Sequence, residues 1–556
     1  DNRPQLGDDI SMRSRADVPM GAMWVLPPGG EGRPTYLADV MGAASAAHLY
    51  GRKQVGAETF GAFLQPWAFS PRDLKRTADL AMALGVNLFN IHTSPHQPLE
   101  GKPGIGLAPF LGQYFSRHET WAENARPWID YLARSSYLLQ QGKPVSDVLY
   151  FYGEEAPLTS LYGQRTPNDL PTGYGFDFIN ADSLQTLLSV KDGDIWTSSG
   201  QSYRLLYLGG SSQRMTLATL KTIRALVAQG ATLVGNRPSG SPSEGDNRAE
   251  FEVLADQLWP KSGSIPTSRG RVITGVTAEQ ALTKMNAQPD LRFDSATPEA
   301  DLRFQHRRLD DGSEIYFIAN LGHQTEKTNA LFRVQGMKPE IWDADSASID
   351  GIAFESKGTQ THVALELASG ESRFVVFRHN SRPREHAVII GDSLQIQTDW
   401  VLSVDAPDAM KYVVRLPELI SWAEATDPRL KYFSGTATYS GRFELQGKCF
   451  ARCYLDLGDV RDLATLTINN HPFRTLWKPP YRVEASKVLV KGWNTIEVKV
   501  INPWVNRLIG DAQPGAKPQL FSTAQPYKAN AALRPSGMIG PVTIAYEKDR
   551  TPARID

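Results

Sequence analysis

The sequence of 556 residues has little cysteine, no long apolar run and no excess of charge of one sign. Two cysteines cannot provide a disulfide framework for a chain of this length. Without about 18 consecutive apolar residues, nothing in the sequence is predicted to span a membrane. Lys and Arg number 59 against 60 Asp and Glu, so the basic surface typical of nucleic-acid binders is missing. We therefore expect neither nucleic acid nor a membrane as a partner.

The first residues, DNRPQLGDDISM, lack an initiator methionine and a leader with a charged and then an apolar region. Our expectation is that a leader was removed or that the chain is the later part of a longer protein.

The two cysteines, Cys449 and Cys453, are four residues apart in a segment that looks like a strand, CFARCYLDL. Four extended residues span roughly 13 Å, which is too far for a disulfide within one strand. No further metal ligands lie nearby in the sequence. We therefore expect two buried, unpaired thiols.

The length predicts several domains, and residues 1–143 have an α/β pattern. A helix is expected over 35–50, a short strand over 54–58, a helix from Ser70 to Gly85 and a strand over 86–92. Ser116 and Glu119 resemble a capping box that opens a long helix. Since an eight-stranded barrel needs about 250 residues, this segment is predicted to be the last part of an (α/β)8 barrel. A small separate α/β domain is the alternative.

The rest of the chain divides into three further predicted domains. Strands alternate with helices over 144–275, including a helix from Thr216 to Gln229, and this alternation predicts a doubly wound parallel sheet. Short strands without helices then predict a small all-β domain over 276–380 and a β-sandwich over 381–556. The predicted fold class is thus multidomain α/β plus all-β.

Two side chains stand at the ends of the predicted strands of the first segment, Glu58 and His92. Active sites of barrels lie at the carboxyl ends of the strands, so both are candidates. An ion-paired rim carboxylate and a hydrogen-bonded core histidine are the structural alternatives. His92 and His96 are four apart but prolines interrupt the segment, so a helical zinc pair is not expected. Aromatic rings, Trp67 among them, and polar side chains suit a sugar site, but any large core contains the same mixture.

Long motifs resemble one family of enzymes. KQVGAETFGAF, SPRDLKRTADLAMALGVNLFNIHTSPHQP, LDLGDVRDLATLTINNHPFRTLWKPPYR and NPWVNRLIGD occur in one order and are similar to the carboxy-terminal half of α-L-rhamnosidases of glycoside hydrolase family 106. The resemblance implies a partial (α/β)8 barrel, an amidotransferase-like α/β domain and β-sandwich domains, the last of them galactose-binding-like. It also implies an inverting enzyme that releases terminal L-rhamnose from a glycan or glycoside.

The resemblance assigns roles to individual residues. Glu58 in GAETF matches the family's general base, and His92 and His96 match a loop that would line the sugar pocket. Trp67 and Arg117 are further candidates for substrate binding. The motif that carries the family's general acid lies upstream of this sequence, so we expect the chain alone to be inactive. Ala22 in VPMGAMW stands where the family pattern has an acidic residue.

The resemblance also implies calcium as a possible cofactor and a periplasmic or secreted location. The sequence itself contains no calcium-binding loop motif, so the metal ligands are unknown. Two other functions stay open. One is a non-catalytic carbohydrate-binding or structural chain, and the other is a related glycosidase with another sugar specificity. In the last domain, Trp477, Tyr481, Trp504, Asn506 and Arg507 are expected either to contact sugar or to join the sandwich to its neighbours.

Overall fold

The structure is a computed structural model that describes residues 7–27, 30, 32–108, 111–163, 165–260, 269–295, 297–380, 390–405, 411–447, 452–518, 520–525 and 527–547. The chain divides into two compact units that are discontinuous in sequence. Unit 1 contains residues 1–59, 76–90 and 132–385, and unit 2 contains residues 60–75, 91–131 and 386–556. The four-domain division expected from the sequence stays a prediction. Mixed α/β and multi-sheet all-β content is present as expected.

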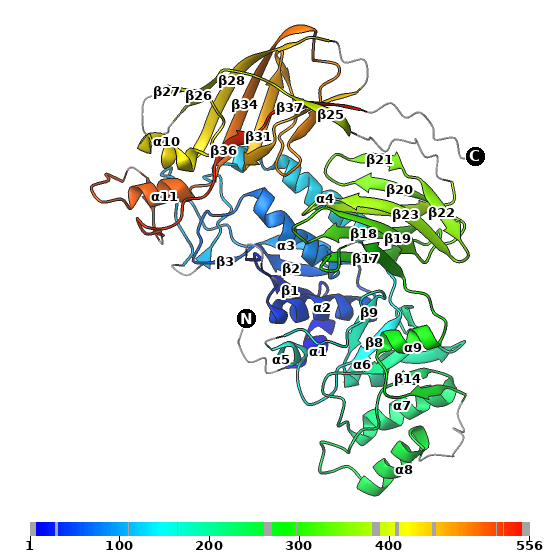
Figure 1. Ribbon diagram of the computed structural model, residues 1–556. Helices are drawn as coiled ribbons and strands as arrows, with labels where there is room; N and C mark the ends of the chain where they lie inside the picture. Colours follow the sequence, from blue (N-terminus) through cyan, green and yellow to red (C-terminus); the bar gives the residue numbers. More distant parts are fainter. Residues whose placement is uncertain are drawn as a thin grey trace, which may run out of the picture. The chain divides into compact units, whose positions relative to one another are not determined.

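The first sheet of the chain has the strand order β1-β2-β4 (Figure 1). β1 (Met20–Met23) is parallel to β2 (Gly56–Thr59), and β4 is Leu88–Ile91. Helix α2 (Pro34–Leu49) packs against β1, and its many alanines are buried because small side chains allow a close approach. Helix α3 (Pro71–Ala83) begins directly after Ser70, as predicted. The strands fit the end of an (α/β)8 barrel, and the barrel itself stays a prediction.

The second sheet of unit 1 is parallel, with strand order β15-β14-β13-β8-β9. In chain order this is the 2-1-3-4-5 arrangement of flavodoxin-like sheets, which confirms the predicted parallel sheet. Helix α7 (Leu217–Gln229) starts at the N-cap Thr216 and ends at Gly230, also as predicted. The antiparallel strands between residues 188 and 203 were not predicted. The elements are β8 (Val148–Phe151), β9 (Phe176–Ile179), α6 (Ala181–Leu187), β10 (Leu188–Lys191), β11 (Asp194–Thr197), β12 (Ser202–Tyr203), β13 (Leu205–Leu208), β14 (Thr232–Val234), α8 (Arg248–Leu258), β15 (Arg271–Ile273) and α9 (Ala278–Lys284).

The all-β part of unit 1 has two sheets, with strand orders β16-β19-β23-β22 and β21-β20-β24-β18-β17-β7. Aromatic and aliphatic side chains from both sheets form one core, with Tyr316 and Phe377 from one sheet and Phe332 and Val363 from the other. The strands are β7 (Lys143–Pro144), β16 (Leu291–Ser295), β17 (Leu302–Arg308), β18 (Glu314–Asn320), β19 (Glu326–Phe332), β20 (Lys338–Asp343), β21 (Ser348–Gly351), β22 (Phe354–Lys357), β23 (Gln360–Leu367) and β24 (Ser372–Arg378). The predicted succession of short strands after about residue 298 is therefore present.

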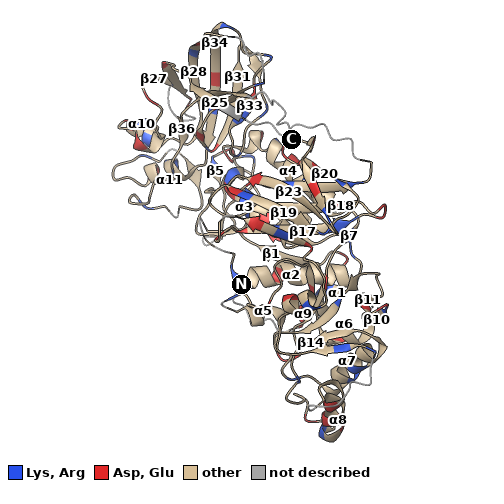
Figure 2. Cartoon of the chain, turned by 45° about the vertical axis from the view of Figure 1, so that its right-hand side comes forward, with Lys and Arg blue, Asp and Glu red and all other residues tan. Residues whose placement is uncertain are grey.

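His306 on β17 lies between two buried carboxylates of unit 1. Figure 2 shows both acidic and basic residues around β17. Its Nδ1 is 2.9 Å from Asp290 Oδ2, and its Nε2 is 2.9 Å from Glu314 Oε2. Burial opposes a charge on the ring, but the attraction and hydrogen bonds of the two carboxylates outweigh it and raise the pKa of His306. Burial likewise opposes ionisation of Asp290, but His306 and Arg333 hold the pKa of Asp290 below its usual value. The cluster therefore favours an imidazolium between carboxylates.

This cluster predicts a pH-dependent stability of unit 1. Because the folded pKa of His306 is raised, its contribution is complete below about pH 6.5 and is lost as pH rises through the folded pKa. Because the folded pKa of Asp290 is lowered, its contribution is present above about pH 4 and is lost on acidification. His306→Gln should lower the free energy of unfolding by about 3 kcal/mol at mildly acidic pH, and by less at alkaline pH.

Urea unfolding at about pH 6 and about pH 8.5 measures this difference. The exposed His323 of the same unit supplies the control variant His323→Gln, which should leave the pH profile unchanged. A loss for His306→Gln that is the same at both pH values would contradict the expectation.

The last part of unit 2 forms two sheets, with strand orders β27-β26-β28-β34-β31-β32 and β25-β37-β29-β33 (Figure 1). They enclose a core that includes Trp422, Tyr439, Val498 and Ile544. The strands are β25 (Ile390–Gln395), β26 (Trp400–Val404), β27 (Tyr412–Leu416), β28 (Gly435–Leu445), β29 (Cys453–Asp456), β31 (Leu463–Ile468), β32 (His471–Pro472), β33 (Arg482–Glu484), β34 (Gly492–Asn502) and β37 (Thr543–Glu547). The helix α11 (Val505–Asp511) follows β34.

Two local predictions are wrong. Cys453 is disulfide-bonded, whereas we expected unpaired cysteines. The reason is that β29 begins only at Cys453, so the spacing of an extended strand does not apply before it; Cys449 lies outside the described residues. The expected capping box does not open a helix either, because α4 (Arg126–Leu139) starts later and a turn and a 3-10 segment precede it.

The sugar-contact alternative for the last domain does not fit the structure. Trp477, Tyr481, Trp504 and Asn506 are each at most 3 % exposed. The Trp504 indole N–H donates to the carbonyl of His118 at 2.9 Å within unit 2. These side chains therefore pack the interior and join the sandwich to residues 91–131, which is the second alternative.

Candidate functional site

Glu58 lies on β2, where its backbone is level with Ala22 on the parallel strand β1. The side chain is half-buried. The indole N–H of Trp24 donates a hydrogen bond to Glu58 Oε1 at 2.9 Å. No described residue donates a hydrogen bond to the other oxygen, Oε2. One oxygen is therefore fixed in direction, and the other can accept a proton from a water molecule.

The end of β1 is held by a half-buried charged pair in unit 1. Asp39 accepts a hydrogen bond from the backbone N–H of Ala22 at 2.6 Å and pairs with Arg13. Arg13 also donates to the carbonyl of Met20 at 3.0 Å. Burial raises the pKa of Asp39, and the Arg13 guanidinium opposes that rise. Ala22 thus contributes its backbone here, and the carboxylate that contacts it comes from α2.

Residues 91–131 of unit 2 carry the predicted loop. His92 is half-buried and His96 is exposed. Gln97, the residue after His96, has a buried side-chain amide. Its oxygen accepts a hydrogen bond from the Ile105 N–H at 2.8 Å, and its NH2 group donates to the Ile105 carbonyl at 2.7 Å. Arg117 donates to the carbonyl of Gln97 at 2.9 Å and pairs with Glu100 at 3.0 Å. Arg117 therefore holds the loop backbone, and Gln97 is a residue that the sequence did not single out.

Trp67 is fully buried in unit 2 and packs edge-on against Tyr114, with ring centroids 5.0 Å apart. Leu508 and Trp504 belong to the same apolar cluster. Because neither face of this indole is open, the expectation that it binds sugar is not carried further. Its sequence signal, an aromatic residue near a barrel loop, does not distinguish a pocket wall from a core.

Glu119 and His118 are unusual groups that sequence reasoning missed. Glu119 is buried, and burial raises its pKa well above the usual value although Gln113 donates a hydrogen bond to Oε1 at 3.2 Å. Burial also lowers the pKa of His118. Burial thus disfavours the charged form of both groups. No sequence signal separates them from the capping pattern that we expected at this position.

Calcium, which the resemblance implied, needs several oxygen ligands close together. Within the described ranges, no group of three or more His, Cys, Asp or Glu side chains could hold a metal ion. Calcium therefore stays a prediction, and we assign no step to it. Among the described helices, none is long and apolar enough to cross a membrane.

A half-buried carboxylate at a strand end, oriented by an indole N–H and with one oxygen open, can act as a general base, and a base of this kind is one of the two carboxyl groups that a glycoside hydrolase uses. Comparison with known families supports this class. The chain belongs to glycoside hydrolase family 106, since the family model described as alpha-L-rhamnosidase matches residues 1–356.

The chain is similar to two relatives over part of their length. The structure of a rhamnosidase from Novosphingobium sp. PP1Y superposes with a TM-score of 0.90 at 44% identity, covering 98% of this chain and 52% of that protein. A protein of Formosa agariphila with the provisional name beta-glucuronidase is 34% identical over 387 residues, which are 68% of this chain and 31% of that protein. The chain thus spans about half of one relative and about a third of the other.

Proposed function

We propose that the protein to which this chain belongs releases terminal L-rhamnose from a glycan or glycoside, with Glu58 as general base. The observation that carries the proposal is the Glu58 carboxylate, with Oε1 fixed by Trp24 and Oε2 open to water. Membership of the rhamnosidase family supports rhamnose as the sugar. Release of sugar from glycans also agrees with the periplasmic or secreted location, which belongs to the same proposal.

The proposed reaction inverts the anomeric carbon. An inverting glycosidase needs two carboxyl groups about 6.5–9.5 Å apart, one to protonate the leaving oxygen and one to activate water. Glu58 takes a proton from the water that attacks the sugar. We assign the acid to a part of the protein that this chain does not contain, which agrees with the 52% coverage of the rhamnosidase. The chain alone is therefore expected to be inactive.

The proposal keeps His92 and His96 as sugar contacts, since both have accessible surface in unit 2. Arg117, which was a candidate for substrate binding, is given a positioning role instead. Its guanidinium is engaged with Gln97 and Glu100, so it supports the loop that carries the histidines.

Another sugar specificity is the competing proposal, because one relative bears the name of a beta-glucuronidase. The longer protein should hydrolyse p-nitrophenyl α-L-rhamnoside and leave p-nitrophenyl β-D-glucuronide and β-D-galactoside nearly untouched. Proton NMR during the first turnovers should show β-L-rhamnose before mutarotation. Faster hydrolysis of the glucuronide would contradict rhamnose as the sugar. α-L-Rhamnose as the first product would contradict inversion and indicate a retaining mechanism. No hydrolysis of any glycoside would favour the non-catalytic alternative.

A further inference from the structure

The outward face of the larger sheet of unit 2 carries a row of polar side chains around one exposed indole. Side chains alternate between the core and the surface along β28 and β34, as the pleat requires. The register places Ser440 opposite Glu497, Arg442 opposite Thr495 and Glu444 opposite Trp493. All six side chains therefore share one face of the sheet.

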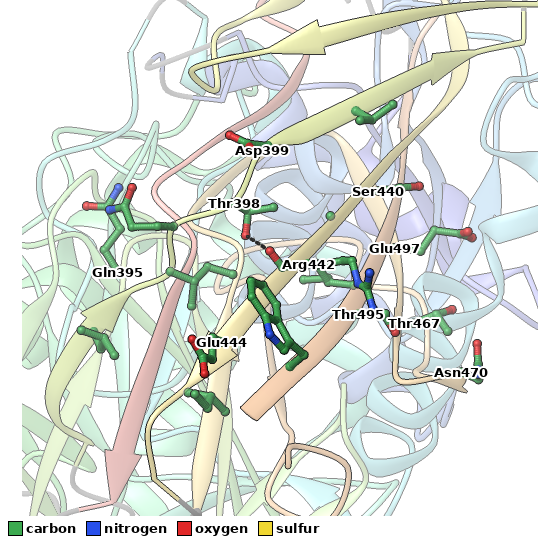
Figure 3. Close-up of a pocket in the computed structure, with 18 of the residues that line it drawn as sticks. Gln395, Thr398, Asp399, Ser440, Arg442, Glu444, Thr467, Asn470, Thr495 and Glu497 are labelled. Carbon is green, nitrogen blue, oxygen red and sulfur yellow. Dashed lines mark hydrogen bonds between the residues drawn. The ribbon is translucent and has the colours of Figure 1, made fainter. Parts of the chain in front are cut away.

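This face is the floor of a groove of about 1150 Å³, whose wall is the segment 394–399. Figure 3 shows Arg442 and Glu444 on one strand with Thr495 and Glu497 on its neighbour. Thr398 lies across from them and donates to the backbone carbonyl of Arg442 at 3.4 Å. A Cβ at Gly441 would come within 2.2 Å of the Thr398 side chain, so the glycine allows this wall to approach the sheet. The groove is therefore built by the fold.

Trp493 is 64% exposed in this groove. Indoles are rarely so exposed on a sheet, because burying the ring is favourable. An exposed apolar surface with a polar rim is typical of a binding site. The flat indole matches the apolar C–H face of a pyranose ring.

The polar groups of the groove suit sugar hydroxyls. Among the described residues, Arg442 and Glu444 have no ion-pair partner, so their side chains can bond to a ligand. Thr467 and Asn470 add an alcohol and an amide at one end. The charged lining consists of Asp399, Glu444 and Glu497 against Arg442. Since Glu497 also pairs with Lys499 at 3.8 Å, the remaining negative excess is small, and it disfavours uronate or sulfated chains relative to neutral ones.

We propose that this groove is a second, non-catalytic carbohydrate site that binds a neutral polysaccharide chain, with Trp493 stacking on a sugar ring. The volume exceeds that of ordinary small-molecule pockets, about 300–1,000 Å³, and therefore fits several sugar units better than one. The site rests on the proposed function only in the choice of rhamnose polymers as ligand. It does not involve Glu58.

The test uses the full 556-residue chain in affinity gel electrophoresis with three probes: a neutral rhamnan, polygalacturonate and free L-rhamnose. We expect retardation by the rhamnan, and weaker or no binding of the other two. Trp493→Ala should weaken rhamnan binding about tenfold or more, as for the central aromatic residue of an interface. Trp493→Tyr should restore most of it, because a phenol ring can still stack.

Tyr137→Ala is the matched control, since Tyr137 is 66% exposed in unit 1 and lies outside the groove. Trp493→Ala and Tyr137→Ala should both keep the melting temperature of the parent. Wild-type binding by Trp493→Ala, preference for polygalacturonate, or absence of rhamnan binding by the parent would each overturn the proposal. In the longer protein, Trp493→Ala should leave hydrolysis of p-nitrophenyl α-L-rhamnoside unchanged. The binding assay therefore tests the groove alone, and the hydrolysis assay tests the role of Glu58.

Discussion

Glu58→Gln in the longer protein should lower kcat for rhamnoside hydrolysis by about 10³-fold, with little change in substrate binding. Glutamine has nearly the same shape and can still accept the Trp24 hydrogen bond, but it cannot take a proton from water. The loss should therefore appear in kcat and leave the dissociation constant of rhamnose close to that of the parent. Steady-state kinetics with p-nitrophenyl α-L-rhamnoside and calorimetric titration with rhamnose measure the two quantities.

Glu100→Gln is the control for this experiment. The Glu100 side chain is 88% exposed and pairs with Arg117 at the loop surface, so its loss of charge should change kcat by less than about twofold. Glu58→Ala with added azide separates a base from a structural residue. The small anion should restore turnover and form an inverted rhamnosyl azide, because azide needs no deprotonation. Near-normal kcat in Glu58→Gln would refute the assignment of the general base.

Arg534→Met should lower the free energy of unfolding of unit 2 by about 3–5 kcal/mol. Arg534 pairs with Asp73 and, at 2.9 Å, with Asp462, and it donates to the carbonyl of Ala68 at 3.0 Å. Burial opposes the charge of Arg534, but Asp462 and Asp73 outweigh it and raise its pKa. Because Asp462 is 1% exposed, removal of the cation leaves a buried carboxylate without its main partner. Urea unfolding at neutral pH measures the loss.

Arg126→Met is the surface comparison within the same unit. Arg126 pairs with Asp130 at 2.7 Å, but its side chain is 82% exposed. Water and salt screen such a pair, so its loss should cost less than about 1 kcal/mol. Equal losses for the two variants would show that burial does not set the strength of the Arg534 cluster. An intermediate loss is expected for Arg534→Lys, which keeps the charge but not the two-sided geometry.

Local signals predicted much of the secondary structure. Thr216 and Gly230 delimit α7 because capping and a positive φ are properties of a few neighbouring residues. Glu58 was singled out as a candidate because a polar residue at the end of an apolar strand is visible in one short segment, and its role stays a prediction.

The missed features depend on burial, on contacts that the fold makes and on where a strand begins. Trp67 is a core residue because Trp504 and Leu508, more than 400 residues later, belong to the same cluster. Glu119 departs from the capping pattern because burial and Gln113 determine its environment. The disulfide of Cys453 was missed because the prediction assumed an extended strand before Cys453, whereas β29 begins only at that residue. Periodicity within a segment contains none of this information.

Residues 60–75 and 91–131 belong to the same compact unit as residues 386–556, although up to several hundred residues separate them in the sequence. The Tyr527 hydroxyl donates to the carbonyl of Pro66, and the Trp504 indole to that of His118. Recombination that exchanged only the carboxy-terminal sandwich between relatives would therefore break its contacts with residues 60–75 and 91–131. A graft from a divergent donor would leave the histidine-bearing loop without its native scaffold, so the two regions would have to be exchanged together.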